Sequence, residues 1–177
     1  LLFSLVVHLG CRQQREARTG HQRHSGRVEH YKKYGRNFFS RYDYEEVESG
    51  AEEMMDHLRK QFADSSFVGS TLKATSSDVS FTVKEADDFS YTDPIDGSVS
   101  KNQGLYIKFT DGSRVVFRLS GTGSQGATIR MYVEKYSNNP EEYPRPTAEG
   151  LKPLIEVALQ LSKLTELTKR EKPTVIT

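Results

Sequence analysis

The sequence predicts an α+β fold in which an antiparallel sheet is packed on one face by two main helices. Three patterns carry this prediction: apolar residues at a mostly 3–4 spacing between Tyr42 and Phe62, alternating β-rich runs between residues 79 and 136, and an apolar stripe near the C-terminus. Because 35% of the 177 residues are hydrophobic and 10% are aromatic, the chain can bury the core of one domain.

The first helix is predicted over Tyr42–Phe62, and the segment Ser65–Gly69 ends it. Its apolar positions suit one face of an amphipathic helix and are Val47, Met54, Met55, Leu58 and Phe62. The simplest interpretation of the two adjacent methionines is that both belong to the core.

Short alternating strands are predicted at Val79–Val83 and Phe89–Tyr91, with turn signals at Asp93-Pro94 and Asp96-Gly97. The clearest element is LYIKFTDGSRVVFRL, residues 105–119, in which two β-rich runs flank Asp111-Gly112. Both turn residues tolerate positive φ, so this segment predicts a β-hairpin. A further strand is predicted over Ile129–Tyr136, followed by a polar surface loop.

The last helix is predicted to begin at Thr147, whose side chain can cap it, with Glu149 in the first turn, where the helix dipole favours negative charge. One apolar stripe runs along this helix: Leu151, Leu154, Ile155, Ala158, Leu159, Leu161 and Leu164. The stripe is expected to pack on the sheet.

Composition excludes several classes of function. A formal net charge of +1 argues against a nucleic-acid binder, which would carry a large excess of basic residues. Cys11 is the single cysteine, so neither a disulfide framework nor a four-thiolate metal site is expected, which fits a reducing compartment. The N-terminal apolar run Leu5–Val7 is too short to cross a membrane.

Residues 1–29 differ in composition from the rest of the chain. They hold five arginines and no lysine, and no large apolar residue lies between Cys11 and Arg27. We therefore expect disorder or a loose helical start there, before the domain proper. Because the chain does not begin with Met, we also expect it to be a fragment of a longer protein.

The most unusual stretch is VVFRLSGTGSQGATIRMYVEKY, residues 115–136, in which SGTGSQGAT joins two strand-like runs. We expect this connection to be longer than the roughly two to five residues of an ordinary hairpin turn. Gly121, Gly123 and Gly126 free the backbone, and Arg118 and Arg130 offer planar forks that match phosphate oxygens. Two interpretations stay open from the residues alone: a phosphate pocket, or a flexible connection with two surface arginines.

The same stretch lacks the marks of other phosphate sites. It contains neither a Gly-Lys-Ser/Thr loop nor the dinucleotide fingerprint, and no nucleophile stands beside a base. The pattern therefore indicates binding rather than bond-making.

Three weaker candidates have simple structural interpretations. His8, Cys11, His21 and His24 are too irregularly spaced for a metal site. Asp93, Asp96 and Ser98 resemble part of a calcium loop, but no glutamate closes it, so a solvated turn is favoured. Arg36 and Arg41 lie among aromatic residues, where a packed helix start is favoured over nucleic-acid stacking; Arg41 stays a candidate for interdomain or substrate contact.

A family resemblance joins these observations. FRLSGTGSQGATIRMY resembles the phosphate-binding loop of the C-terminal domain of phosphoglucomutases, in the α-D-phosphohexomutase superfamily. Other segments resemble the same domain in the same order: KKYGRNFFSRYDYEEVE at residues 32–48, SFVG, DPIDGSVSKNQGL, FTDGSRVVFRLSGTG and the terminal PTVIT. The resemblance covers about residues 28–177 and implies a TATA-binding-protein-like fold for residues 30–177, the fourth domain around a central cleft.

The resemblance also implies a site. The residues expected to hold the substrate phosphate remote from the transferred one are Arg118, Ser120, Gly121, Thr122 and Arg130. Those expected to shape the loop are Gly123, Ser124, Gln125, Gly126 and Ala127. No catalytic residue and no metal ligand is expected in this chain.

The function that the resemblance implies is that of a cytoplasmic isomerase, an intramolecular phosphotransferase of glucose and carbohydrate metabolism. The family interconverts glucose 1-phosphate and glucose 6-phosphate through glucose 1,6-bisphosphate, with Mg²⁺ as cofactor. The implied partners are a sugar phosphate and the remaining domains of the full-length enzyme, with no nucleic acid and no membrane.

This sequence also departs from the family pattern. The family's Thr-Ala-Ser-His-Asn-Pro, Asp-Gly-Asp-Gly-Asp and Gly-Glu-Glu-Ser loops do not occur in it, so the chain alone is expected to be inactive. Residues 1–29 do not match the family's Trp-Leu-rich helix, and a reading-frame error is one hypothesis for them. The alternative function is that of a domain in a non-catalytic, phosphoglucomutase-like structural or adhesion protein.

Overall fold

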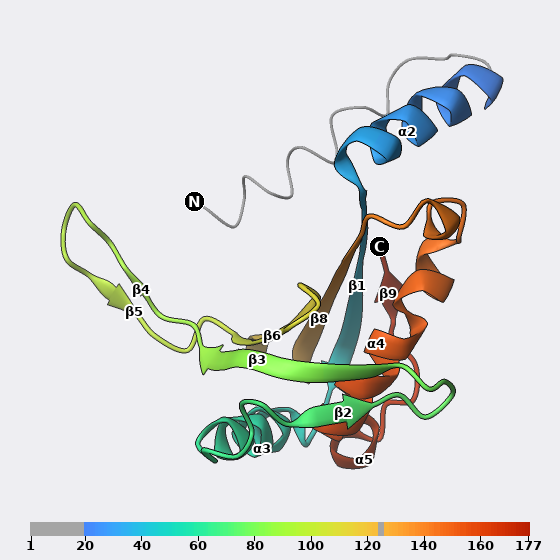
Figure 1. Ribbon diagram of the computed structural model, residues 1–177. Helices are drawn as coiled ribbons and strands as arrows, with labels where there is room; N and C mark the ends of the chain where they lie inside the picture. The colour runs from blue at the N-terminus through green and yellow to red at the C-terminus, as the bar shows by residue number, and fades with distance from the viewer. Residues whose placement is uncertain (1–19, 124–125) are drawn as a thin grey trace.

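The computed structural model describes residues 20–123 and 126–177 and confirms the predicted α+β fold (Figure 1). Its centre is a seven-stranded antiparallel sheet with the order β2-β3-β6-β7-β8-β1-β9. The strands are β1 (Arg36–Val47), β2 (Thr71–Lys73), β3 (Ser80–Asp88), β6 (Leu105–Phe109), β7 (Arg114–Gly123), β8 (Gly126–Ser137) and β9 (Val175–Ile176).

Helices α3 (Ala51–Phe62), α4 (Thr147–Ser162) and the short α5 (Leu164–Thr168) lie together beside the sheet (Figure 1). Their apolar side chains pack on the strands, because the same core holds Met54 and Leu58 of α3, Leu154 of α4, Phe117 of β7 and Met131 of β8. All five of these side chains are buried. The predicted packing of two main helices on one face is therefore confirmed.

The predicted helix over Tyr42–Phe62 is wrong in its first part, because β1 continues to Val47 and α3 begins only at Ala51. Tyr42 and Tyr44 alternate toward the core as strand residues, opposite Met131 and Ile129 of β8. The predicted 3–4 spacing therefore included Val47, at the end of a strand, together with residues of the helix that follows it. Gly50 separates the two with a φ of 81°, a conformation that favours glycine.

The predicted hairpin around Asp111-Gly112 is confirmed. Strands β6 and β7 pair from Leu105 opposite Phe117 to Lys108 opposite Arg114. At the turn Gly112 has a φ of 85°, and the Asp111 carboxylate accepts hydrogen bonds from the backbone N–H and hydroxyl of Ser113 at 3.0 and 2.6 Å. This local chemistry fixes the register of the sheet.

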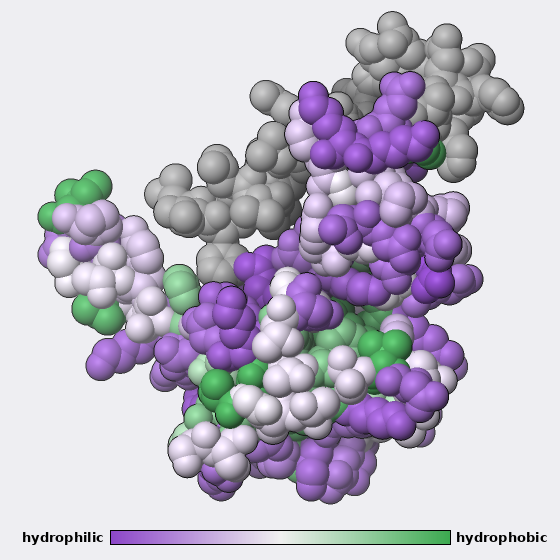
Figure 2. All heavy atoms as spheres, in the orientation of Figure 1, coloured by the Kyte–Doolittle hydropathy of each residue, from purple (hydrophilic) through white to green (hydrophobic). Residues whose placement is uncertain are grey.

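The predicted strands Val79–Val83 and Phe89–Tyr91 need correction. Strand β3 continues through charged residues to Asp88, because it pairs with β6 along that whole length. Two-residue strands β4 (Tyr91–Thr92) and β5 (Val99–Ser100) then form an arm that projects from the sheet (Figure 1). Apolar side chains lie at its end (Figure 2), where Ile95 is 94% exposed. Asp93 and Asp96 accept backbone hydrogen bonds within this arm, at 2.7 and 2.8 Å.

The C-terminal helix begins at Thr147 as predicted, but Thr147 does not cap it. Pro146 occupies the cap position and makes no side-chain bond there. The Thr147 hydroxyl instead accepts a hydrogen bond from Arg36 at 3.2 Å. The predicted stripe packs on the core, with Leu151, Leu154 and Ala158 buried, and the sequence analysis missed Val157, which is also buried. The prediction that the same helix reaches Leu164 is wrong, because α4 ends at Ser162, Lys163 has a φ of 50°, and the buried Leu164 begins α5.

Arg36 lies at the start of a strand, not of the helix that was expected. Its guanidinium donates to the carbonyl oxygens of Tyr143 and Arg145, both at 2.5 Å. The guanidinium carbon also lies 4.1 Å from the centre of the Phe38 ring. Arg36 therefore ties β1 to the start of α4, near the 3-10 turn η1 (Pro140–Glu142).

Helix α2 (Gly20–Tyr34) precedes the sheet and includes part of the atypical segment 1–29. Its last turn contacts the domain, since the Tyr136 hydroxyl donates to the carbonyl of Tyr34 at 3.0 Å and the rings of Tyr31 and Tyr143 are 5.7 Å apart. His8, Cys11 and the side chains of His21 and His24 lie outside the described residues. The division of the chain at residue 30 stays a prediction. Among the described helices, none is long and apolar enough to span a membrane.

Candidate functional site

The stretch that the sequence analysis singled out forms a β-hairpin that is tighter than expected. Strand β7 runs to Gly123 and β8 starts at Gly126, and these two glycines pair across the ladder. The prediction of a long connection is therefore wrong. The small residues between Arg118 and Arg130 are compatible with strand pairing as well as with a loop, so composition alone could not separate the two. Ser124 and Gln125 lie outside the described residues, as does the side chain of Thr122.

Two irregularities bend the sheet beside this hairpin. Gly121 is the extra residue of a bulge in β7, with a φ of 71°, between the pairs Ser120–Thr128 and Thr122–Ala127. Strand β1 has a second irregularity between Tyr44 and Val47, where Glu46 has a φ of 54°. Both lie against the first residues of β8, at the same end of the sheet.

Gly126 is required where the two irregularities meet. Its φ is 84°, and a Cβ placed there would lie 3.1 Å from the carbonyl carbon of Glu46 and from the Val47 oxygen. These neighbours are backbone atoms and cannot move aside easily. Arg170 holds the same bulge in place, because its guanidinium donates to the carbonyls of Glu45 and Glu46 at 3.1 and 2.5 Å.

Arg118 and Arg130, predicted to flank the loop, are direct cross-strand neighbours on β7 and β8. Asp43 of β1 lies directly opposite Arg130 on its other side. Directly opposed residues share a face of the sheet, and along β8 the buried residues alternate with Arg130, so this face is the one opposite the helices. We call Arg118, Arg130 and Asp43 the arginine row.

Within the arginine row the carboxylate is buried and the guanidinium side chain beside it is partly exposed. The Arg130 side chain is 40% exposed, whereas that of Asp43 is 6% exposed. Asp43 Oδ2 lies 3.9 Å from Arg130 Nε, and Asp43 Oδ1 lies 3.1 Å from Arg41 Nε. Arg41 thus lies beside the row, and its predicted role in interdomain or substrate contact stays a prediction.

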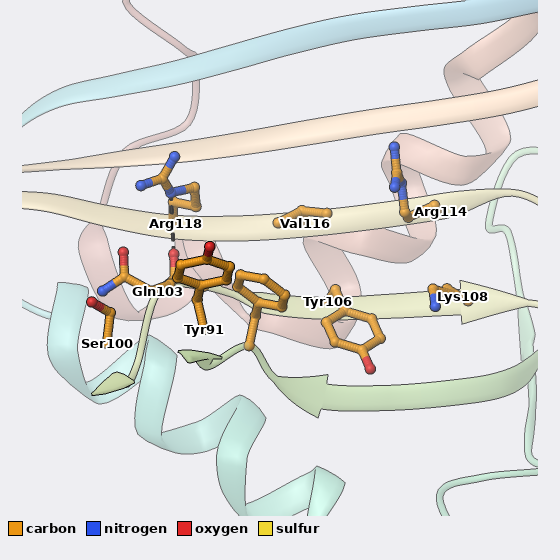
Figure 3. Close-up of a pocket in the computed structure, with 10 residues that line it drawn as sticks. Tyr91, Ser100, Gln103, Tyr106, Lys108, Arg114, Val116 and Arg118 are labelled. Carbon is orange, nitrogen blue, oxygen red and sulfur yellow. Dashed lines mark hydrogen bonds between the residues drawn. The ribbon is translucent and has the colours of Figure 1, made fainter. Parts of the chain in front are cut away.

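Arg118 is held at the stem of its guanidinium. Its Nε donates to the carbonyl of Gln103 at 3.1 Å (Figure 3). Gly104 makes room for this arrangement, because a Cβ there would lie 2.9 Å from Arg118 Cγ and 3.0 Å from the Phe117 oxygen. Neither Gln103 nor Gly104 was singled out in the sequence analysis.

A hollow of about 450 Å³ adjoins Arg118, between the sheet and the β4–β5 arm (Figure 3). Its lining residues are Phe89, Tyr91, Ser100, Gln103, Gly104, Tyr106, Lys108, Arg114, Val116 and Arg118. At its far end Lys108 pairs with Glu85 at 3.1 Å, and Arg114 pairs with Glu134. Within residues 20–123 and 126–177, Arg118 forms a hydrogen bond to a neutral carbonyl and no ion pair with a carboxylate, in contrast to Lys108 and Arg114.

Tyr106 lines the same hollow but has little acid–base capacity. Its hydroxyl donates to Glu85 at 2.5 Å, and this bond, together with burial, raises the pKa of Tyr106 to about 12. The same bond, followed by the one from Lys108, lowers the pKa of Glu85. Glu85 and Tyr106 therefore stay fixed in their protonation states near neutral pH, which suits a binding surface better than a proton-transfer site.

A metal site does not fit the described part of the chain. Within residues 20–123 and 126–177, no group of three His, Cys, Asp or Glu side chains could hold a metal ion. The Mg²⁺ that the family resemblance implies was expected for the whole enzyme, with its ligands outside this chain.

The fold and the arginine row define an α+β domain with a candidate site for an oxyanion. Residues 36–174 match the model of the phosphoglucomutase-1 C-terminal domain family. This match covers most of the chain, so the chain belongs to the family of phosphoglucomutase-1 C-terminal domains.

Named relatives agree with this assignment. The chain is 55% identical over 150 residues to phosphoglucomutase-1 of Homo sapiens, an alignment that covers 84% of this chain and 26% of the human protein. It is 55% identical to the chloroplastic phosphoglucomutase 1 of Marchantia polymorpha, covering 84% of this chain and 22% of that protein, and 51% identical to the cytoplasmic phosphoglucomutase of Pisum sativum, covering 84% and 26%. The chain thus spans about a quarter of the length of the relatives that it matches.

A solved structure shows the same fold. The chain is similar to the open form of parafusin (pp63), an exocytosis-sensitive phosphoprotein and phosphoglucomutase from Paramecium, with a TM-score of 0.67 and 42% identity. That similarity covers 85% of this chain and 24% of the Paramecium chain. Since the matched relatives are named phosphoglucomutases, the alternative of a non-catalytic structural or adhesion protein is not favoured.

Proposed function

We propose that this chain is the phosphate-binding domain of a phosphoglucomutase that interconverts glucose 1-phosphate and glucose 6-phosphate through glucose 1,6-bisphosphate. The observation that carries the proposal is the position of Arg118 and Arg130, directly opposite each other on the face of the sheet away from the helices. Like charges in that arrangement repel, and a bound phosphate dianion would turn the repulsion into attraction.

The arginine row would bind the phosphate that is not being transferred. Each guanidinium offers a planar fork to two phosphate oxygens, and Ser120, Gly121 and Thr122 add donors along β7. In the proposed reaction the sugar turns around between two half-reactions, so the site must accept the phosphate at either end of glucose. Donors that contact only the phosphate suit this requirement, because they do not read the sugar.

The other steps of the proposed reaction would be carried out by the other domains of the enzyme. The matched relatives are about four times longer than the matched part, and we propose that their other domains supply the transferred phosphoryl group, the Mg²⁺ site and the residues that contact the sugar. Catalytic residues are not assigned to this chain. We further propose a cytoplasmic location, which is supported by the name of the Pisum sativum relative and by the single cysteine, although the Marchantia polymorpha relative is chloroplastic.

The test is calorimetric titration of glucose 6-phosphate into the 177-residue chain and its variants at low ionic strength. Arg118→Ala and Arg130→Ala should each weaken binding about tenfold or more, because a hydrogen bond to a charged group contributes about 1.5–3 kcal/mol. The matched control is Arg145→Ala, which removes an arginine that is 56% exposed and pairs with Glu142 instead.

Binding that is equal in the wild type and both arginine variants would contradict the proposal. A loss of affinity in Arg145→Ala that matches the loss in Arg118→Ala would also contradict it, because net charge alone would then explain the effect.

A further inference from the structure

Asp43 is an unusual residue to find beside an anion site. It carries a negative charge, its side chain is only 6% exposed, and it lies in line with Arg130 and Arg118 across three adjacent strands. A carboxylate at this place repels a phosphate, so on charge alone it would weaken binding. If Asp43 favours phosphate binding, it must do so by an effect that is larger than this repulsion.

The contacts of Asp43 indicate that contribution. Its two oxygens face the Nε atoms of two different arginines, Arg41 at 3.1 Å and Arg130 at 3.9 Å. Both guanidinium groups are more exposed than the carboxylate, with side-chain exposures of 36% and 40%. The carboxylate is thus the buried member of the cluster, and both of its contacts are with Nε atoms, not with terminal guanidinium nitrogens.

Arg118 shows the same arrangement with a different acceptor. Its Nε donates a hydrogen bond to the backbone carbonyl of Gln103, an exposed residue, again at the stem of the guanidinium. In both arginines of the row an oxygen therefore lies near Nε, as a hydrogen-bond acceptor for Arg118 and as an ion-pair partner at 3.9 Å for Arg130. A fork oriented in advance loses less side-chain entropy when the ligand binds.

The cluster is also incompletely satisfied. Buried polar atoms in proteins nearly always have a hydrogen-bond partner. Among the described residues, however, Arg41 Nε, Asp43 Oδ1 and Arg130 Nε are buried and lack a bond of good geometry. Ion pairs of this kind are weak evidence for stability, since desolvation offsets much of their attraction. A cluster kept for stability alone would be expected to satisfy these atoms.

We propose that Asp43 is a positioning residue, which orients the guanidinium groups of Arg130 and Arg41 toward the phosphate. This inference rests on the proposed function, because it assumes that the arginine row binds a phosphate. Asp43 does not touch the ligand; it acts through the two arginines.

The direction in which Asp43→Asn changes the affinity for phosphate distinguishes a positioning role from a purely electrostatic one. Asp43→Asn keeps the shape of the side chain and removes its charge. If Asp43 acted on the phosphate only through its charge, this variant would bind phosphate more tightly than the wild type. If Asp43 positions Arg130, the variant should bind about tenfold more weakly, since a misaligned fork loses a charge-assisted bond.

The experiment measures the affinity of the 177-residue chain for inorganic phosphate and glucose 6-phosphate, together with the ¹⁵N relaxation of the arginine Nε–Hε groups without ligand. The variants are Asp43→Asn and Asp43→Glu, which keeps the charge but moves the carboxylate. The control is Asp56→Asn on α3, which makes the same charge change at a carboxylate that is 61% exposed and pairs with Arg59.

We expect weaker binding in both Asp43 variants, unchanged binding in Asp56→Asn, and faster Nε motion of Arg130 in Asp43→Asn. Equal or tighter binding in Asp43→Asn, or Arg130 motion that is unchanged in both Asp43 variants, would overturn the inference. A wild-type chain that binds neither anion would instead contradict the proposed function, and the relaxation of Arg130 would still show whether Asp43 holds that side chain. Should Asp43→Asn fail to fold, the same measurements on Asp43→Glu decide the matter.

Discussion

The two faces of strand β8 differ in what they contribute. Ala127, Ile129, Met131 and Val133 are buried against the core and the helices, while the residues between them, including Arg130, are only half-buried on the other side. Strand β7 repeats the division at neighbouring positions, with Phe117 fully buried and Arg118 beside the hollow. One strand therefore serves two purposes at alternate residues: one face holds the fold together, and the other presents charge.

The largest expected difference between the two faces is the loss of stability when the adjacent residues Phe117 and Arg118 of β7 are each replaced by alanine. Phe117→Ala should lower the free energy of unfolding by about 3–5 kcal/mol, because it removes a large buried side chain from a packed core. Arg118→Ala should change it by less than about 1 kcal/mol and could raise it, since Arg118 lies directly opposite Arg130. Urea denaturation followed by circular dichroism measures both values. Comparable destabilisation by the two substitutions would show that the faces are not specialised.

A second test compares two glycines at the end of the hairpin. Gly126→Ala should cost about 1–3 kcal/mol of stability, because the residue has a φ of 84° and its Cβ would press on the backbone of β1. Gly121→Ala is the control: its φ is 71°, but a Cβ there meets no heavy atom of the described residues within 4 Å, so only the backbone strain remains among these contacts. Equal effects on the unfolding free energy would mean that the contact with Glu46 does not matter.

The smallest expected effect is the pH dependence contributed by Glu142, in the 3-10 turn η1 that follows β8. Hydrogen bonds from Ser137 and then Lys135 lower the pKa of Glu142 below the ordinary 4.5. Its stabilising contribution is therefore fully present above pH 4.5 and is lost as the pH falls through the lower, folded-state value.

Glu142→Gln removes this contribution. Its unfolding free energy should differ from that of the wild type above pH 4.5, and the difference should shrink as the pH falls below 4.5, as followed by denaturation at each pH. A difference that stays constant over this range would contradict the assigned cause.

Local signals in the sequence were sufficient for part of this structure. The turn at Asp111-Gly112 was predictable because its two residues determine their own backbone geometry. The end of strand β1 (Arg36–Val47) was not predictable from local signals. Its apolar residues are followed by those of α3 at a spacing that also suits a helix, and only the pairing of β1 with β8 shows that Tyr42 and Tyr44 belong to a strand.

Some residues of the candidate site were predictable from the sequence, and others were not. Arg118 and Arg130 were predicted as site residues from their residue types and from the family resemblance, and the structure shows that they are cross-strand neighbours. Asp43 could not be identified, because its burial beneath Arg41 and Arg130 arises from the pairing of strands far apart in the chain. Gly104 was missed for a similar reason: its role depends on where the stem of Arg118 lies.

The most direct test of the central claim is a titration of the ¹⁵N-labelled chain with glucose 6-phosphate, observed at the Nε–Hε resonances of its arginines. If Arg118 and Arg130 together bind one phosphate, both resonances should shift with a single common Kd, and glucose without phosphate should shift neither. Shifts at Arg59 or Arg145 while Arg118 and Arg130 stay unchanged would contradict the account.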